Sequence, residues 1–450
     1  MSEPQTLESA PHAGHAAPLS AGASRYALGL LVVVYIFNFI DRSILSILLE
    51  DIKQAFDVSD TYLGFLSGIA FALFYTLMGL PIARWADRGS RTTIIALAIF
   101  VWSAMTAATG LARSFAHLAI ARVGVGIGEA GCSPPAHSLI SDYFPPERRA
   151  TALAIYSLGI PIGGAVGFWA GGWLNEFFDW RVAFMVVGLP GCLLAVVVKL
   201  TLPEPPRGAY DSSTESAVTK SAGAQSPGRD GMWVVLHFLR SLPSFRHMAF
   251  GASLHAFYGY GASAFIAAFF MRSHGIPSGE LGTWLAVLGF TGGVAGTYLG
   301  GYLSDRLSVR DPRWPMWVPA VATTLYIPFA FLLYLWPDGR TALILSFPGS
   351  FLGGMYLGPT FAMTQSLVPS HMRATASAIL LLVINLIGLG LGPQVVGILS
   401  DLLHGEFGVE SLRYAMLSVV VVFASWSIVH YTLAARTLTE DLEAKNHLGE

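Results

Sequence analysis

The chain has 450 residues, of which 54% are hydrophobic and only 12% are charged, and its mean hydropathy is +0.58. A soluble protein carries about twice that share of charge, so the composition predicts a multi-pass membrane protein that is embedded in a lipid bilayer. The formal net charge of -2 says little, because orientation depends on where the basic residues lie. No nucleic-acid partner is expected. Cys132 and Cys192 fall in apolar stretches, which favours small buried side chains over a disulfide or a metal site.

The N-terminal residues 1–25 are polar and rich in Ala, Ser, His and Pro, which predicts a disordered segment without a cleavable signal peptide. After them, twelve stretches are long and apolar enough to span a bilayer, which takes about 20 residues each. They are 26–50, 61–85, 92–112, 115–142, 150–175, 181–202, 248–272, 278–305, 314–336, 341–368, 373–401 and 411–435. The predicted fold class is therefore all-α, with twelve transmembrane helices in two six-helix bundles, residues 26–202 and 248–435.

Residues 203–247 separate the two predicted bundles. They begin with a Pro/Ser/Gly-rich stretch that indicates a linker. They end with "MWVVLHFLRSLPSFRH", which is amphipathic and predicts a short helix on the membrane surface. The alternative is that this piece is a frayed start of the seventh span. Residues 436–450 are expected to form a tail outside the membrane.

The distribution of basic residues predicts the orientation of the chain. Of the 26 Lys and Arg residues, 18 lie in the set of loops that shares a side with both termini, 6 lie in the other set, and Arg42 and Arg122 lie inside spans. Because Lys and Arg are enriched in cytoplasmic loops, both termini are expected to be cytoplasmic. The short loops favour a bacterial inner (plasma) membrane.

The two halves repeat weakly. "ARWADRGSR" after the second span matches "GGYLSDRLS" after the eighth, and "FPPERRATALA" before the fifth matches "VPSHMRATASA" before the eleventh. Repeated Asp-Arg loops favour a cytoplasmic gate that latches when the other side is open, whereas orientation signals and lipid contacts would explain only the Arg excess. The predicted gate residues are Asp87, Arg88, Arg91, Arg148, Arg149, Asp305, Arg306 and Arg373.

Two spans carry ionisable groups where a charge costs at least a few kcal/mol. On the first span, polar residues at positions i, i+3, i+6 and i+7 share one broad face of the helix: Tyr35, Asn38, Asp41 and Arg42. On the fourth span, Arg122, Gly126 and Glu129 again share one face. Two acids and two bases are therefore expected to meet between the first and fourth helices, where pairing lowers their cost.

This charged set has two interpretations. It could simply lock the two helices together. Alternatively it is a proton and substrate relay, in which Glu129, the deepest acid, is the first candidate for proton coupling and Asp41 the second. Arg42 and Arg122 are then charge partners of these acids, or they bind an anionic head group bidentately.

The second half offers no comparable acid or base inside its spans. Its polar and aromatic residues suggest an aromatic cavity wall opposite a charged one, which suits an amphipathic substrate, although each single residue is more often a packing residue. The predicted cavity residues of both halves are Tyr35, Asn38, His255, Tyr258, Tyr356, Gln365 and Asn385.

Several of these motifs are similar to those of the major facilitator superfamily. The loop after the second span resembles G-x-L-x-D-R-x-G-R, although Ala83 and Ser90 stand where that pattern has Gly. "RVGVGIGEA" in the fourth span and "GIPIGGAVG" in the fifth resemble two further motifs of the superfamily. The resemblance covers nearly the whole chain and implies two parallel halves with a substrate site between them.

A narrower resemblance is to the Spinster family of lysolipid and sphingosine-1-phosphate transporters. It rests on "NFIDR", "RVGVGIGEAGCS", "SLISDYF", "LPEPPRG" and "GPQVVGILSD". It implies roles in transport for the membrane-embedded acids and bases. Similar "NxxDR" starts also occur in organic anion and sugar acid symporters of the same superfamily.

The sequence thus predicts a proton-coupled secondary transporter that works by alternating access on a lysolipid or another amphipathic anion. The alternative is an organic anion or sugar acid symporter. An enzyme is not expected, because the sequence has no nucleotide-binding loop, metal cluster or nucleophile with a base at a recognisable spacing. No cofactor is expected beyond the proton gradient as driving force, and the protein is expected to be a monomer.

Overall fold

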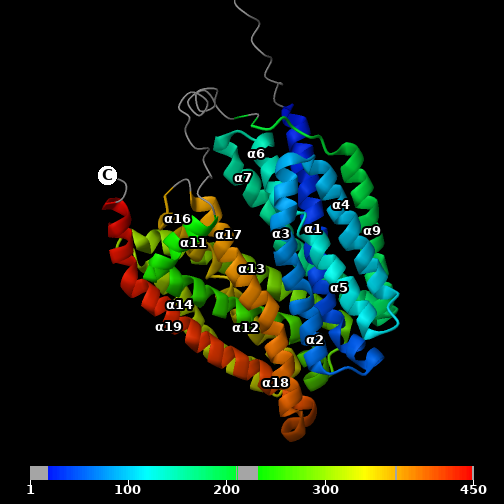
Figure 1. The fold of residues 1–450 in the computed structure, drawn as a ribbon. Helices are drawn as coiled ribbons and strands as arrows, with labels where there is room; N and C mark the ends of the chain where they lie inside the picture. Colours follow the sequence, from blue (N-terminus) through cyan, green and yellow to red (C-terminus); the bar gives the residue numbers. More distant parts are fainter. Residues whose placement is uncertain (1–18, 209, 211–231, 370–371, 448–450) are drawn as a thin grey trace, which may run out of the picture.

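The computed structural model describes residues 19–208, 210, 232–369 and 372–447, which form helices and no strand (Figure 1). The predicted disordered segment up to residue 18 and most of the predicted linker, 211–231, lie outside the described residues.

The N-terminal half, residues 19–208, contains nine helices that cover the first six predicted spans. Three of these spans are broken in two, at Gly68, at residues 130–132 and at Leu158. The helices are α1 (Ala21–Phe56), α2 (Asp60–Ser67), α3 (Ile69–Arg88), α4 (Arg91–Gly110), α5 (Phe115–Glu129), α6 (Ser133–Tyr143), α7 (Pro146–Ser157), α8 (Gly159–Phe177) and α9 (Trp180–Thr201). Side-chain caps start several of them: Ser20, for example, accepts a hydrogen bond from the Ala23 amide.

The C-terminal half covers the other six predicted spans, with breaks in the tenth and a π-helical turn in the eleventh. Its elements are α11 (Met232–Ser241), α12 (Pro243–His274), α13 (Ser278–Ser308), α14 (Trp314–Leu335), α15 (Gly339–Gly353), α16 (Leu357–Ser366), α17 (Arg373–Ile384), the π-helix η2 (Asn385–Leu391), α18 (Gly392–Phe407), the 3₁₀ turn η3 (Gly408–Glu410) and α19 (Ser411–His447).

The structure extends several predicted boundaries. α1 begins at Ala21, inside the predicted N-terminal segment, α12 begins inside the predicted linker, and α19 continues through the predicted tail to His447. α11 forms where the surface helix is predicted, and its Val235 and Leu239 are buried against the C-terminal half. Its place relative to a membrane stays a prediction.

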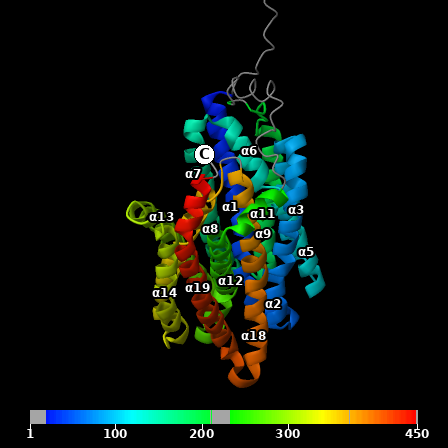
Figure 2. The same cartoon turned by 60° about the vertical axis from the view of Figure 1, so that its left-hand side comes forward.

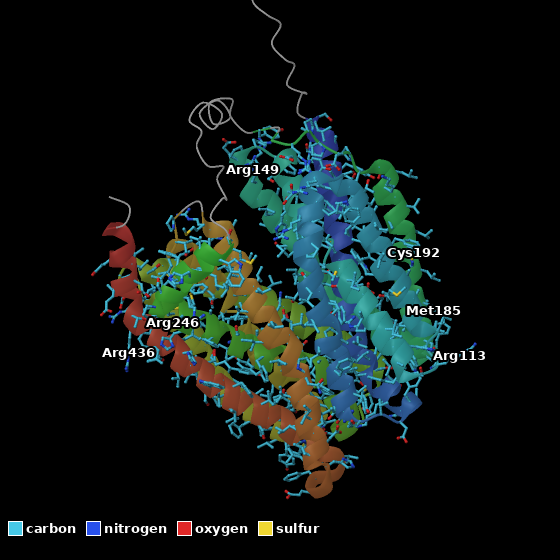
Figure 3. The ribbon with its side chains drawn as sticks, viewed as in Figure 1. Arg113, Arg149, Met185, Cys192, Arg246 and Arg436 are labelled. Atoms are coloured by element: carbon cyan, nitrogen blue, oxygen red, sulfur yellow. The ribbon has the colours of Figure 1, made fainter. Side chains whose placement is uncertain are left out.

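Nine helical segments within the described residues are long and apolar enough to cross a membrane, and the last, Arg373–Glu443, contains two predicted spans. The two other predicted spans are also helical. The fourth is interrupted by the break after α5, and the eighth, α13, is rich in glycine. Cys132 is buried, and Cys192 is partly buried on α9 (Figure 3); neither forms a disulfide.

The two halves meet at one end of the molecule. We call the end where α1 begins and α19 finishes the terminal end, and the other the opposite end. α2 packs on α18 and α8 on α13, with backbones so close that a Cβ at Gly397 would lie 2.1 Å from the Asp60 carbonyl oxygen. A Cβ at Gly282 would lie 2.3 Å from that of Phe168. Only glycine permits such contact.

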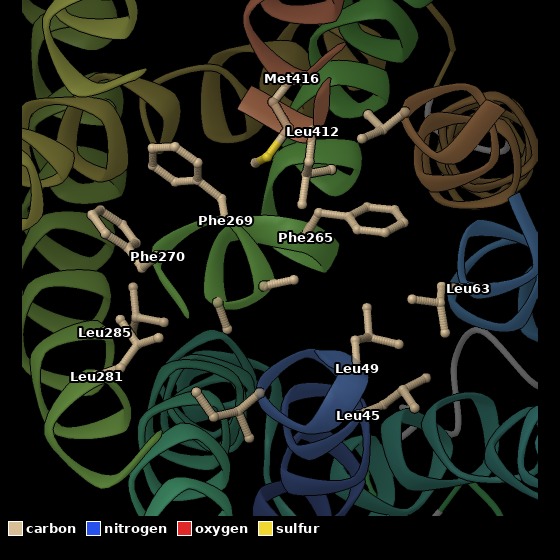
Figure 4. Close-up of a cluster of buried hydrophobic side chains, with 14 of the residues drawn as sticks. Leu45, Leu49, Leu63, Phe265, Phe269, Phe270, Leu281, Leu285, Leu412 and Met416 are labelled. Carbon is tan, nitrogen blue, oxygen red and sulfur yellow. The ribbon is translucent and has the colours of Figure 1, made fainter. Parts of the chain in front are cut away.

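An apolar cluster seals the same region. It joins leucines of α1 and α2 to aromatic side chains of α12 and to residues of α13 and α19, as Figure 4 shows for Leu45, Leu49, Leu63, Phe265 and Met416. Toward the terminal end the ribbons of the two halves diverge in Figure 1, whereas in the turned view of Figure 2 they overlap. The halves are thus packed together from the middle of the molecule to the opposite end.

Candidate functional site

An ion pair joins the first and fourth predicted spans. Arg42 Nε of α1 donates a hydrogen bond to Glu129 Oε2 at the end of α5, at 2.7 Å, and the Glu129 residue is 1% exposed. The side chain of Asn38, one turn before Arg42, lies beside Glu129. Pairing lowers the cost of burying both charges. The structure therefore brings together two of the four predicted charged groups directly.

The other two charged groups lie close to this pair without an ion pair of their own. Arg122 and Asp41 line one small pocket with Thr106 and Thr109. Among the described residues, Asp41 Oδ1 and Arg122 Nε have no hydrogen-bond partner, although both residues are buried. Unpartnered buried polar groups such as these are costly.

Aromatic rings surround the two guanidinium groups. The Arg42 guanidinium carbon lies 5.0 Å from the ring centre of Phe39, 4.9 Å from that of Phe71 and 5.0 Å from that of Tyr75. The Arg122 guanidinium carbon lies 4.6 Å from the Phe71 ring centre. The sequence analysis missed Phe71 and Tyr75. Their spacing of four residues in "FALFY" places both on one face of α3, which is the only local signal.

The two arginines border a cavity of about 160 Å³ between the two halves. Arg42, Arg122 and Phe71 form its N-terminal wall, and Tyr260 and Ser263 of α12 face them. We call this space the charged chamber. Its full lining is Phe39, Arg42, Ser43, Leu45, Ser46, Ser67, Phe71, Arg122, Phe168, Tyr260, Ser263, Ala264, Leu389 and Pro393.

A second cavity, of about 360 Å³, lies mainly within the C-terminal half, and we call it the aromatic chamber. It shares Phe168, Tyr260 and Ser263 with the charged chamber. The two spaces are therefore adjacent across these residues. Its ring-bearing walls are His255, Tyr258, Tyr260, Tyr326, Tyr334 and Tyr356.

His255 is held firmly in the wall of the aromatic chamber. Its Nε2 lies 3.1 Å from the Gly353 carbonyl oxygen and so donates to it, which leaves Nδ1 of the neutral ring to accept from the Tyr258 hydroxyl at 2.8 Å. The ring stacks on Tyr356 at 4.0 Å. Since Gly353 ends α15, His255 ties α12 to the break in the tenth span.

Four predicted cavity residues lie elsewhere. Tyr35 stacks on Tyr156 of α7 at 4.2 Å. Gln365 is exposed on α16, with Nε2 3.5 Å from Ser377 Oγ. Asn385 is the first residue of η2. As far as the described residues define the two chambers, these side chains and Asn38 are outside their walls.

The predicted gate residues do not form one cluster. Asp87, Arg88, Arg148, Asp305 and Arg373 are all exposed. Arg306 donates to the Tyr302 hydroxyl on its own helix at 2.8 Å. Arg149, near the terminal end in Figure 3, donates to the carbonyl oxygens of Ser141 and Phe144 at 3.0 and 3.2 Å.

Arg91 differs from the other predicted gate residues because it is buried within the N-terminal half. It forms ion pairs with Asp142 and, at 2.8 Å, with Glu204. Arg207 donates to the Ala86 and Gly89 carbonyl oxygens at 2.6 and 2.8 Å. Arg91 thus fastens the start of the predicted linker, "LPEPPRG", to the terminal end.

We call the contacts of Arg91, Glu204 and Arg207 that hold the start of the linker the linker clamp. Its Glu204 lies outside the predicted spans. Burial alone would raise its pKa, but hydrogen bonds from the Thr92 amide and Arg91 outweigh burial and hold the pKa below its ordinary value. A carboxyl with a lowered pKa stabilises the clamp above its ordinary pKa, and this contribution is lost as the pH falls through the lowered value.

We therefore expect Glu204→Gln to loosen the linker at neutral pH. Hydrogen bonds to a charged group contribute roughly 1.5–3 kcal/mol, so tryptic cleavage after Arg207 should become about tenfold faster. Timed digestion with mass spectrometry measures this rate. Glu147→Gln, at an exposed glutamate of α7, serves as the control, and equal rates in both variants would show that the clamp does not restrain the linker.

A polar network closes the opposite end between the two halves. Arg272 at the end of α12 pairs with Glu50 of α1 and with both oxygens of Asp60 of α2, at 2.7 and 2.8 Å. Asp60 also accepts from Lys53 at 2.7 Å and from Ser400 at 2.6 Å. The carboxylate of Asp401 on α18 accepts from the Asp60 and Thr61 amides at 3.0 and 2.8 Å.

Lys53 and Arg272 are two of the six bases in the loops on the side away from the termini. Arg272 belongs to the C-terminal half and its partners Glu50 and Asp60 to the N-terminal half, so no local pattern could pair them. The carboxylate of Asp401, a residue of α18, contacts the N-terminal amides of α2, where a negative charge is favoured. The network centred on Asp60 and Arg272, which we call the opposite-end lock, holds α1 and α2 against α12 and α18.

Comparison with known proteins gives a family match and several similar transporters. The profile of the Major Facilitator Superfamily matches residues 31–393. An MFS-type efflux pump of Mycolicibacterium smegmatis is 34% identical over 448 residues, which are 98% of this chain and 99% of the relative. A hexuronate transporter of Bacillus subtilis is 24% identical over 439 residues, 93% and 98% of the two chains.

Among solved structures, the chain is similar to a bacterial homologue of the human lysosomal transporter Spinster in an inward-facing and unoccupied conformation. The TM-score is 0.85 and the identity 34%, and the match covers 94% of this chain and 99% of that one. These relatives are transporters rather than enzymes, and they support a plasma-membrane location for this multi-pass protein. The chain belongs to the major facilitator superfamily of membrane transporters and, within it, resembles the Spinster proteins.

Proposed function

We propose that the protein is a proton-coupled secondary active transporter that moves a lysolipid or another amphipathic anion by alternating access. The observation that carries the proposal is that Arg42, which is paired with the buried Glu129, and Arg122, which makes no ion pair with a described residue, both line a cavity between the two halves. A structural lock between helices would not need to border a cavity.

The coupling follows from competition for Arg42. An anionic substrate group that binds Arg42 draws it away from Glu129, and the buried carboxylate then takes up a proton because it has lost its counter-charge. Release of the substrate restores the ion pair and expels the proton. Asp41, which shares a pocket with Arg122, is the second group that can respond in this way.

Arg122 is the first receptor for the anionic group in this conformation, before that group competes with Glu129 for Arg42. Arg42 already donates to Glu129, whereas Arg122 makes no ion pair with a described residue and borders the charged chamber. Its planar fork suits a phosphate or carboxylate. The adjacent aromatic chamber offers apolar and ring-bearing walls to the rest of an amphipathic molecule.

A smaller anion is the second candidate. The likeness to a hexuronate transporter and the limited volume of the charged chamber, about 160 Å³, favour an organic anion or sugar acid that uses this chamber alone. Size and apolarity of the accepted substrate separate the two candidates.

We further propose that the terminal end faces the cytoplasm, as the excess of Lys and Arg in its loops suggests. The packed opposite end would then make this conformation inward-facing. The predicted latch around Asp87 and Asp305 would be released here and would form when the opposite end opens. The protein is proposed to act as a monomer, without a cofactor.

Uptake into liposomes tests the proposal. Purified protein is reconstituted, and entry of a labelled lysophospholipid and of a labelled hexuronate is measured with and without an inward proton gradient. Lysophospholipid flux that depends on the gradient supports the leading proposal. Hexuronate flux alone supports the second candidate, and flux of neither solute contradicts both substrate classes.

A further inference from the structure

The ring of Phe71 is shared by the two buried arginines. Its centre lies 4.9 Å from the Arg42 guanidinium carbon and 4.6 Å from that of Arg122, and the residue is 0% exposed. A guanidinium is attracted to the face of an aromatic ring more strongly when it is desolvated than at an exposed site. Because Phe71 is fully buried, its contacts with the two arginines are of the desolvated kind.

Arg122 depends on this ring more than Arg42 does. Arg42 also has Glu129, Phe39 and Tyr75, whereas for Arg122 the structure gives Phe71 as the ring contact and no hydrogen bond or ion pair with a described residue. A stacked guanidinium keeps the N–H groups in its plane free to donate. Phe71 can thus hold Arg122 while leaving its donors available to an anion.

The backbone fixes the position of the ring. Gly126 lies one turn after Arg122 on α5, and a Cβ there would lie 2.7 Å from the Phe71 carbonyl oxygen. This close contact seats α3 against α5 at the level of the site. Phe71, Arg42 and Arg122 also line the charged chamber together, so the position of the ring sets where both guanidinium groups lie.

We propose that Phe71 is a positioning residue of the anion site, which holds Arg122 with its N–H donors available to the charged chamber and fixes its spacing from Arg42. The inference rests on the proposed function only in taking this chamber as the place where a substrate anion binds.

Fluorination of the ring tests the proposal, because it weakens the negative face and changes the volume little. Trifluorophenylalanine in place of Phe71 should lower the affinity for lysophosphatidate about tenfold. Phe71→Tyr should have an affinity close to that of the unmodified protein, and Phe71→Leu should bind at least as weakly as the fluorinated protein. The matched control is the same replacement of Phe100, an exposed residue of α4 that is outside the walls of both chambers as the described residues define them, and it should leave the affinity unchanged. Equal losses at both positions, or none at Phe71, would overturn the proposal.

A second readout separates this inference from the proposed function. If the unmodified protein does not bind lysophosphatidate, the substrate class is wrong, and the rate at which phenylglyoxal modifies Arg122 then decides the role of Phe71. The fluorinated ring at position 71 should raise that rate several-fold over the Phe100 control, as judged by peptide mass spectrometry. An unchanged rate would show that Phe71 does not hold Arg122.

Discussion

Glu129→Gln is expected to abolish proton-driven uptake while the protein still folds. The glutamine keeps the shape of the side chain but removes both the titrating group and the counter-charge of Arg42, which Glu129 contacts at 2.7 Å. Removing one partner of a buried ion pair costs about 3–5 kcal/mol. We therefore expect the gradient-dependent component of uptake to fall at least about 100-fold.

Two controls make this expectation specific. Glu147→Gln changes the charge in the same way at an exposed position and should leave uptake unchanged. Exchange of labelled substrate without a gradient shows whether the variant still moves its substrate. Unchanged gradient-driven uptake in Glu129→Gln would remove Glu129 from the coupling mechanism and leave Asp41 as the remaining candidate.

Asp60→Asn is expected to open the opposite end. Asp60 accepts from Arg272, Lys53 and Ser400 at 2.6 to 2.8 Å, and the neutral amide cannot compensate the two cations. The loss of about 3–5 kcal/mol from the closed arrangement is enough to shift a two-state equilibrium more than about 100-fold. Spin labels at Phe178 and Val409, which are exposed in loops of the two halves, report the change as a longer distance between the labels.

The matched control is Glu406→Gln, which removes an exposed acid near the end of α18. It should leave the distance distribution unchanged. If Asp60→Asn gives the same distribution as this control, the opposite-end lock does not hold the closed conformation, and the apolar cluster with the glycine contacts of α2 and α18 must suffice.

Hydropathy alone predicted the helical spans well, because an apolar stretch of that length has few other solutions in a bilayer. It could not predict where spans break, since Gly68, Leu158 and the π-helix at Asn385 are changes of backbone geometry inside apolar segments. The extension of α19 to His447 was missed for a related reason: its last turns are polar, and a span criterion stops where apolar residues stop.

The candidate site was predictable in part. Helical periodicity placed Asp41, Arg42, Arg122 and Glu129 on facing sides of two spans, and the structure shows Arg42 paired with Glu129. Periodicity gave no reason to add Phe71, because an aromatic residue in a span is ordinary. The pairing of Asp60 with Arg272 depends on how one half packs against the other, and no spacing within either segment encodes it.

The most direct test of the account is to record the pH inside liposomes. A trapped indicator reports this pH while a lysophospholipid gradient is imposed without a proton gradient. If the Arg42–Glu129 pair couples the two movements, substrate flowing downhill drives protons across the membrane, and the internal pH shifts in the protein-containing vesicles but not with Glu129→Gln. Substrate flux without any pH shift in the unmodified protein would contradict proton coupling.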